Sequence, residues 1–253
     1  MATVVGWVAD NCSVQMNWHR NGGSSLAARK RSVHLRGLKR IAIAMGETVD
    51  IKLNFINESN DRNDPQIVIF QKNVAAASEA ETIAWLVIQH CGVGDNHPFT
   101  YPMTMQVAGG DSWGNFTPRL EAEPGLMYAM TRTSSGDTLR FHGPATDPAE
   151  VQVLNALPQG AISANIYRAD RLLACKTSIV PQEIAAFEFE PTLWIGVASE
   201  VVEGEVIDAA VLSAVNTQIS LLGISSADIV MTGGGPGPQS PPFIFSLANV
   251  EMA

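Results

Sequence analysis

The chain has 253 residues, of which 46% are hydrophobic and 16% charged, and its formal net charge is −9. This balance is typical of a globular protein and excludes a largely disordered chain. The charge is uneven, because residues 1–44 carry +6 and the remaining residues carry −15. An acidic body repels polyanions, so we expect no nucleic-acid partner and no attraction to anionic membranes.

The first 44 residues differ in composition from the rest. They hold seven of the 16 Lys and Arg residues, one acidic residue and none of the 14 prolines. This pattern fits a basic arm, a transit peptide or an extension without a function of its own. The last interpretation is favoured, because a basic arm would fold back onto the acidic body. We predict a disordered extension over 1–44, and whether it belongs to the native product stays open.

The sequence indicates neither a membrane-spanning segment nor a signal peptide. No window approaches the roughly 18 consecutive apolar residues of a membrane helix, so no transmembrane segment is predicted. The N-terminus lacks a basic region leading into an apolar stretch and a cleavage site, so we predict no signal peptide and a cytoplasmic location. Export by a route without a cleaved signal stays open. Cys12, Cys91 and Cys175 are too few for a disulfide framework.

From residue 49 onward, short segments alternate between polar and hydrophobic residues, as half-buried strands do. Asp50–Phe55 is the clearest example, and 168–171 indicates a tight hairpin between two such segments. Turn residues separate the segments at spacings of about 8–12 residues, which is typical of sandwiches and barrels. The predicted strands are 50–55, 66–70, 100–107, 126–130, 138–141, 151–154, 162–167, 172–175, 186–189, 193–197, 218–222, 228–231 and 243–247.

Two segments have helical features. Ser78 and Glu81 form a capping-box pattern and predict a helix over 78–89, although the apolar run 85–88 equally fits a buried strand. A second helix is predicted over 207–215. The fold class is therefore all-β, an antiparallel β-sandwich with at most one or two short helices. It is either one domain over 45–253 or two units, 45–142 and 161–253, joined by a turn-rich connection over 143–160.

One segment concentrates potential metal ligands. His90, Cys91, Asp95 and His97 lie within eight residues, and His142 would complete a three-ligand site of the catalytic zinc type. The spacing matches no standard zinc motif, and histidines hydrogen-bonded to the backbone explain it more simply. A divalent metal is the only cofactor that the sequence suggests. A metal-dependent enzyme using His90, His97 and His142 is the alternative function, with Asp95 or Asp111 as general base.

The segment 110–114, Gly-Asp-Ser-Trp-Gly, matches the G-x-S-x-G pattern of a nucleophile elbow. That motif needs a helix after the serine, and the residues that follow do not form one. We therefore assign no catalytic residue and predict a polar turn with a buried Trp113. If the ring is exposed instead, it could stack on a sugar.

The leading hypothesis is a non-catalytic binding or self-assembling β-sandwich protein. Its ligand, a saccharide or another small neutral molecule, would meet the loops 90–97, 109–118 and 232–242 at one end of the sandwich. A homo-oligomer is plausible because sheet edges can pair. A membrane-inserting β toxin is a second alternative, based on adaptable methionines. The predicted ligand-binding residues are Trp113, Asp111, Asn115 and Asn96.

Overall fold

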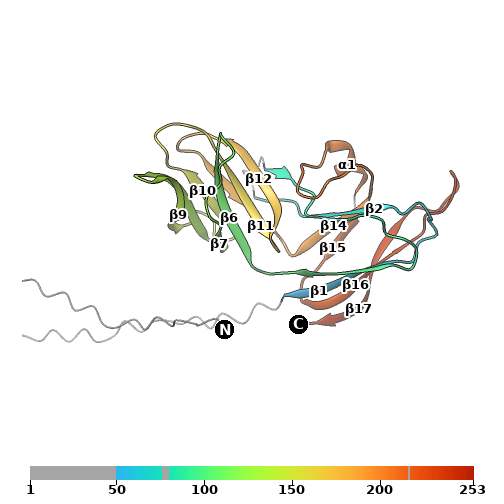
Figure 1. Ribbon diagram of the computed structural model, residues 1–253. Helices are drawn as coiled ribbons and strands as arrows, with labels where there is room; N and C mark the ends of the chain where they lie inside the picture. The colour runs from blue at the N-terminus through green and yellow to red at the C-terminus, as the bar shows by residue number, and fades with distance from the viewer. Residues whose placement is uncertain (1–49, 76–79, 216) are drawn as a thin grey trace, which may run out of the picture. The chain divides into compact units, whose positions relative to one another are not determined.

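The computed structural model describes residues 50–75, 80–215 and 217–253, which belong to one compact unit. The predicted extension over 1–44 lies outside the described residues. Strands contain 54% of the described residues and helix 3%. The prediction of an all-β, sandwich-like fold is therefore confirmed. Four sheets rich in antiparallel pairs make up the fold, and Figure 1 shows them as layers.

The first of two four-stranded sheets contains both the first and the last strand of the described chain. The β1 sheet has the order β17 (Ile244–Met252), β16 (Ile224–Thr232), β1 (Ile51–Asn57) and β5 (Asn96–Tyr101). The β2 sheet has the order β15 (Thr217–Ser220), β14 (Thr192–Ala198), β2 (Gln66–Phe70) and β4 (Leu86–Ile88). The two sheets meet where Nε2 of Gln71 donates to the hydroxyl of Tyr101 at 3.0 Å.

The middle of the chain forms the other two sheets. The β6 sheet has the order β3 (Glu81–Thr82), β12 (Arg171–Ile179), β11 (Ile162–Arg168), β6 (Met105–Asp111) and β7 (Leu120–Ala122). The β8 sheet has the order β13 (Ile184–Phe187), β10 (Val151–Asn155), β8 (Leu126–Thr133) and β9 (Gly136–Pro144). The hydroxyl of Tyr128 on β8 donates to the carbonyl of Glu121 on β7 at 2.6 Å, which ties these sheets together.

The chain leaves the β1 sheet after β5, enters the β6 sheet at β6, and returns to the β2 sheet between β13 and β14. The segment 143–160 lies within the β8 sheet and includes β10. The β1, β2 and β6 sheets each combine strands from 45–142 with strands from 161–253. The sheets are therefore not divided at 143–160.

Burial follows the sequence pattern closely. On β1, Ile51, Leu53 and Phe55 are buried and the residues between them are more exposed, as the period of two predicts. Strand β2 is buried over four consecutive residues because a second apolar cluster covers its other face. That cluster includes partly buried side chains of α1 (Ala209–Ala214), whose N-terminus is capped by Asp208. The helix predicted over 207–215 is thus confirmed.

The helix predicted over 78–89 is wrong for the part that the structure describes. Residues 81–82 form β3 and residues 86–88 form β4. The two strands find backbone partners in β12 and β2, and the apolar side chains of Ile83, Trp85 and Ile88 are buried between layers. Tertiary pairing therefore overrides the local capping pattern. Among the described residues, no helix has the length and apolar character needed to cross a membrane.

The strand predicted over 100–107 is two strands. Strand β5 ends at Tyr101 and β6 begins at Met105, and they belong to different sheets. Pro102 lies between them, and proline has no N–H with which to continue a ladder. The break is the point at which the chain passes from the β1 sheet to the β6 sheet.

Candidate ligand-binding site

A pocket of about 470 Å³ lies between the loop that follows β6 and the hairpin of β8 and β9. Its volume is in the range of small-molecule sites, which is roughly 300–1,000 Å³. Two kinds of side chain line it, exposed aromatic rings and groups that can form hydrogen bonds. The aromatic, charged and amide side chains among them are Asp111, Trp113, Asn115, Phe116, Arg132 and Asp137.

A single carboxylate organises the loop. Oδ1 of Asp111 accepts hydrogen bonds from the backbone N–H groups of Trp113 and Asn115, each at 2.9 Å. Oδ2 of Asp111 accepts from Nδ2 of Asn115, also at 2.9 Å. These bonds, led by the Asn115 side chain, lower the pKa of Asp111. Asp111 is therefore ionised at neutral pH and acts mainly to hold the turn.

The turn presents Trp113 and Phe116 to solvent. Trp113 is 87% exposed and Phe116 is 60% exposed. The prediction that Trp113 is buried is wrong, because the turn closes on itself through Asp111 and places the indole beyond the sheet. The ring of Phe116 lies against Gly110, where a Cβ would stand only 2.9 Å from a ring carbon. Gly110 is thus what allows the aromatic ring to approach the strand.

The other wall carries an ion pair. Arg132 and Asp137 are directly opposite each other on β8 and β9, with Nε to Oδ1 at 2.8 Å and Nη2 to Oδ2 at 3.1 Å. The bidentate pair lowers the pKa of Asp137. Because Arg132 neutralises Asp137, the charge of Asp111 leaves the pocket with a net charge of about −1.

No family model, curated protein or solved structure matched this chain. Three of the four predicted ligand-binding residues, Asp111, Trp113 and Asn115, line the pocket together. The fourth, Asn96, is exposed on β5 of the β1 sheet and does not line the pocket.

The three loops expected at one end of the sandwich lie in two places. In the 90–97 loop, the Gly94 N–H donates to the carbonyl of Asn57 at 2.7 Å. In the 232–242 loop, the Gly233 carbonyl accepts from the N–H of Asn60 at 2.7 Å. Both loops thus adjoin the segment after β1. The 109–118 loop lies on the opposite side of Figure 1, beyond β6.

The three histidines proposed as metal ligands are not brought together. His90 is exposed in the loop after β4, His97 lies on β5 opposite Phe55, and His142 is exposed on β9 of the β8 sheet. Within the described residues, no group of three or more His, Cys, Asp or Glu side chains could hold a metal ion. Their proximity in sequence is misleading because β5 carries His97 into a strand while His90 stays in the turn.

Sequence reasoning missed the second wall of the pocket. Arg132 and Asp137 flank the polar run 133–136, which ends at Gly136. Two opposite charges at equal distances from the centre of such a turn face each other across a hairpin. That pattern could have predicted the ion pair. It could not have placed the hairpin beside the β6–β7 loop, because the two come together only through packing of the β6 and β8 sheets.

Proposed function

We propose that this protein is a non-catalytic binding protein whose pocket, defined by Trp113, Phe116, Asp111, Asn115, Arg132 and Asp137, takes a saccharide. The observation that carries the proposal is the 87% exposure of Trp113 beside a pocket with hydrogen-bonding groups. An exposed indole is costly to leave in water and is suited to stacking on the C–H face of a sugar ring. Asn115 and the Arg132–Asp137 pair offer donors and acceptors to its hydroxyls.

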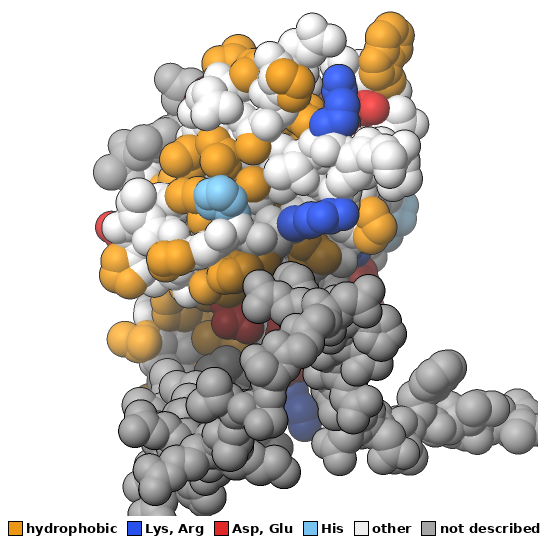
Figure 2. Space-filling view, turned by 90° about the vertical axis from the view of Figure 1, so that its left-hand side faces the viewer, with side chains coloured by type: hydrophobic (Ala, Val, Ile, Leu, Met, Phe, Trp, Pro, Cys, Tyr) orange, Lys and Arg blue, Asp and Glu red, His pale blue; other side chains and the backbone are white. Residues whose placement is uncertain are grey.

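The charge of the surroundings favours a neutral ligand. The pocket has a net charge of about −1, which opposes phosphates and other polyanions. Figure 2 views the side of the molecule on which β9 lies in Figure 1. Hydrophobic side chains and atoms of the backbone or of uncharged polar side chains cover most of the described surface there, and charged side chains are few. A ligand with apolar faces and hydroxyl groups fits such a surface.

Replacing Trp113 by Ala should abolish saccharide binding and change the free energy of unfolding by no more than about 0.5 kcal/mol. The stacking surface is lost, while an 87% exposed side chain contributes little to the core. A glycan array identifies a binding sugar, and isothermal titration calorimetry then compares the variants. Leu222→Ala is the matched control, because Leu222 is 76% exposed and does not line the pocket. Unchanged binding by Trp113→Ala would refute the proposed site.

A second candidate function, self-association, is favoured by the edge of the β1 sheet. Strand β17 is nine residues long and, in the described part of the chain, pairs only with β16. Ile244, Val250 and Met252 on it are 56%, 43% and 69% exposed. A long apolar edge strand is a template for pairing with another strand. The edge of β17 that faces away from β16 would therefore meet a second copy of the chain.

Ile244→Lys should convert the resulting oligomer into a monomer, because a lysine on an edge strand opposes pairing. Size-exclusion chromatography with light scattering gives the mass at several protein concentrations. Val180→Lys is the control, since Val180 is similarly exposed at 54% and lies outside the β1 sheet. A wild-type chain that stays monomeric at high concentration would rule out self-association through β17.

A further inference from the structure

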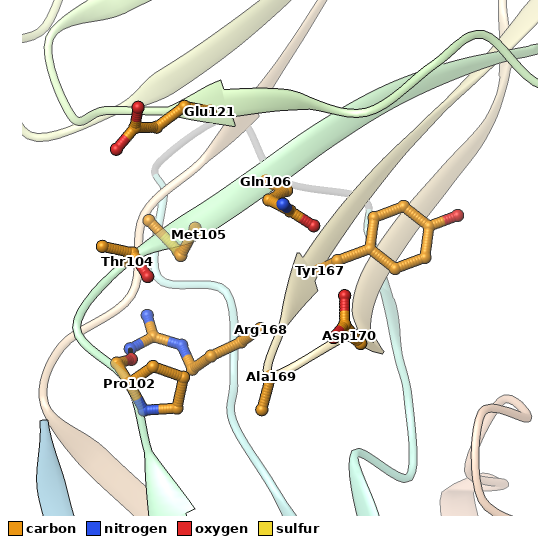
Figure 3. A pocket seen from close by; sticks show the side chains of 9 residues that line it. All are labelled: Pro102, Thr104, Met105, Gln106, Glu121, Tyr167, Arg168, Ala169 and Asp170. Carbon is orange, nitrogen blue, oxygen red and sulfur yellow. Dashed lines mark hydrogen bonds between the residues drawn. The ribbon is translucent and has the colours of Figure 1, made fainter. Parts of the chain in front are cut away.

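A second pocket, of about 370 Å³, lies where the chain passes from β5 to β6. The β5–β6 connection forms one side through Pro102 and Thr104, and the turn between β11 and β12 forms another. Figure 3 shows the guanidinium of Arg168 reaching from β11 toward Pro102 and Thr104. The carboxylates of Glu121 and Asp170 lie on other sides of the pocket.

Arg168 is buried, with only 4% of its surface exposed. Its position follows from the strand pattern, because Ile162, Ala164 and Ile166 are also buried and Arg168 continues the same face of β11. The hairpin fixes it further. Ala169 and Asp170 both have positive φ, 51° and 61°, as the central residues of a type I′ turn do, and Arg168 pairs with Arg171 across it.

The protein leaves this buried cation without a counter-charge. Nη1 of Arg168 donates to the carbonyl of Pro102 at 2.8 Å, and Cζ lies 4.3 Å from the centre of the Tyr101 ring. Nε is buried without a hydrogen-bond partner, and none of the ion pairs among the described residues includes Arg168. Burial raises the pKa of Tyr101, so its hydroxyl stays neutral at physiological pH.

The two nearby acids do not supply the missing charge. Asp170 is paired with Nη1 of Arg119 at 3.1 Å, at the exposed side of the turn. Glu121 is exposed on β7, where water solvates its carboxylate. An uncompensated buried charge is costly, and a bound anion would offset that cost.

We propose that the pocket at Arg168 binds a small organic carboxylate, held by the guanidinium where it lines the cavity. A guanidinium matches a carboxylate in shape and offers it two parallel N–H groups. One N–H of Nη1 donates to the carbonyl of Pro102 and Nε is buried, so the remaining N–H groups of Nη1 and Nη2 are the ones left for the ligand. The site is separate from the saccharide pocket and does not depend on it, since the two share no lining residue.

The test is isothermal titration calorimetry of the full chain with succinate, acetate and neutral succinamide. We expect succinate or acetate to bind and succinamide not to bind. Arg168→Lys, which keeps the charge and loses the planar fork, should weaken binding by about tenfold or more. Arg132→Gln, in the other pocket, should leave carboxylate binding unchanged.

A second variant covers the case in which Arg168→Lys fails to fold. Glu121→Gln removes from the pocket a negative charge that repels the carboxylate ligand, and it does not alter the core. It should strengthen succinate binding by on the order of twofold. A purely structural Arg168 would give no carboxylate binding, and no effect of Glu121→Gln. Failure of both carboxylates to bind at about 10 mM, or binding of inorganic phosphate alone, would overturn the proposal, since a specific site should exceed millimolar affinity.

Discussion

Replacing Trp85 by Ala should lower the free energy of unfolding by about 3–5 kcal/mol, the range for large buried aromatics. Trp85 is 1% exposed and makes edge-to-face contacts with Phe99 and Tyr101, with ring centroids 6.3 and 6.0 Å apart. Its Nε1–H donates to the carbonyl of Arg168 at 2.9 Å. The side chain therefore joins the β1 sheet to the β6 sheet, and its loss removes packing from both.

Urea unfolding measures this effect, and two other tryptophan variants make it specific. Trp85→Phe keeps most of the apolar volume but leaves the carbonyl of Arg168 without its donor, so we expect a loss of about 1–3 kcal/mol. Trp113→Ala removes the same type of side chain from an exposed position and should cost no more than about 0.5 kcal/mol. Equal losses for Trp85→Ala and Trp113→Ala would mean that Trp85 contributes no more to the core than an exposed side chain does.

The fold class could be predicted because the hydrophobic pattern of a strand involves only residues that are close together in the sequence. Strand β1 alternates with a period of two, and the tight hairpin around Ala169 and Asp170 is visible in its flanking strands. Strands β3 and β4 could not be found in this way. Each is two or three residues long and exists only because β12 or β2 offers it a ladder. Their backbone partners lie far away in sequence.

The candidate sites show the same difference between residues that are close in sequence and residues that are distant. Asp111, Trp113 and Asn115 are close in sequence, so one turn brings them together and the sequence pattern was sufficient. Arg132 and Asp137 complete the pocket from another sheet. Whether Trp113 is buried also depends on what lies above the turn, which no local pattern encodes. The histidines show the opposite error, because His90 and His97 are near in sequence but one lies in a loop and the other on β5, and His142 lies in another sheet.

The two pockets differ in how their charged side chains are paired, in a way that fits different ligands. Around Trp113, an ion pair leaves one ionised carboxylate and exposed rings, which suits a neutral molecule. Around Arg168, a buried guanidinium has a carbonyl and an aromatic ring as neighbours but no carboxylate partner among the described residues, which suits an anion. Because one chain holds both pockets, Trp113→Ala should abolish saccharide binding and leave carboxylate binding unchanged. Arg168→Lys should weaken carboxylate binding and leave saccharide binding unchanged.

Gly233→Ala should destabilise the protein by about 2–4 kcal/mol and disturb the 232–242 loop. Gly233 has φ of 85°, and a Cβ there would overlap the carbonyl oxygen of Pro242. The carbonyl of Gly233 also accepts from the N–H of Asn60, so a shift should reduce protection of that amide in hydrogen exchange. Gly237→Ala is the matched control, because its φ is 95° but a Cβ meets no atom within 4 Å. Gly237→Ala should lower the free energy of unfolding only by the cost of holding an alanine in the left-handed backbone region, about 1–2 kcal/mol. Equal effects of the two substitutions would mean that the loop relaxes around Gly233. The close contact between Gly233 and Pro242 would then not fix the shape of the loop.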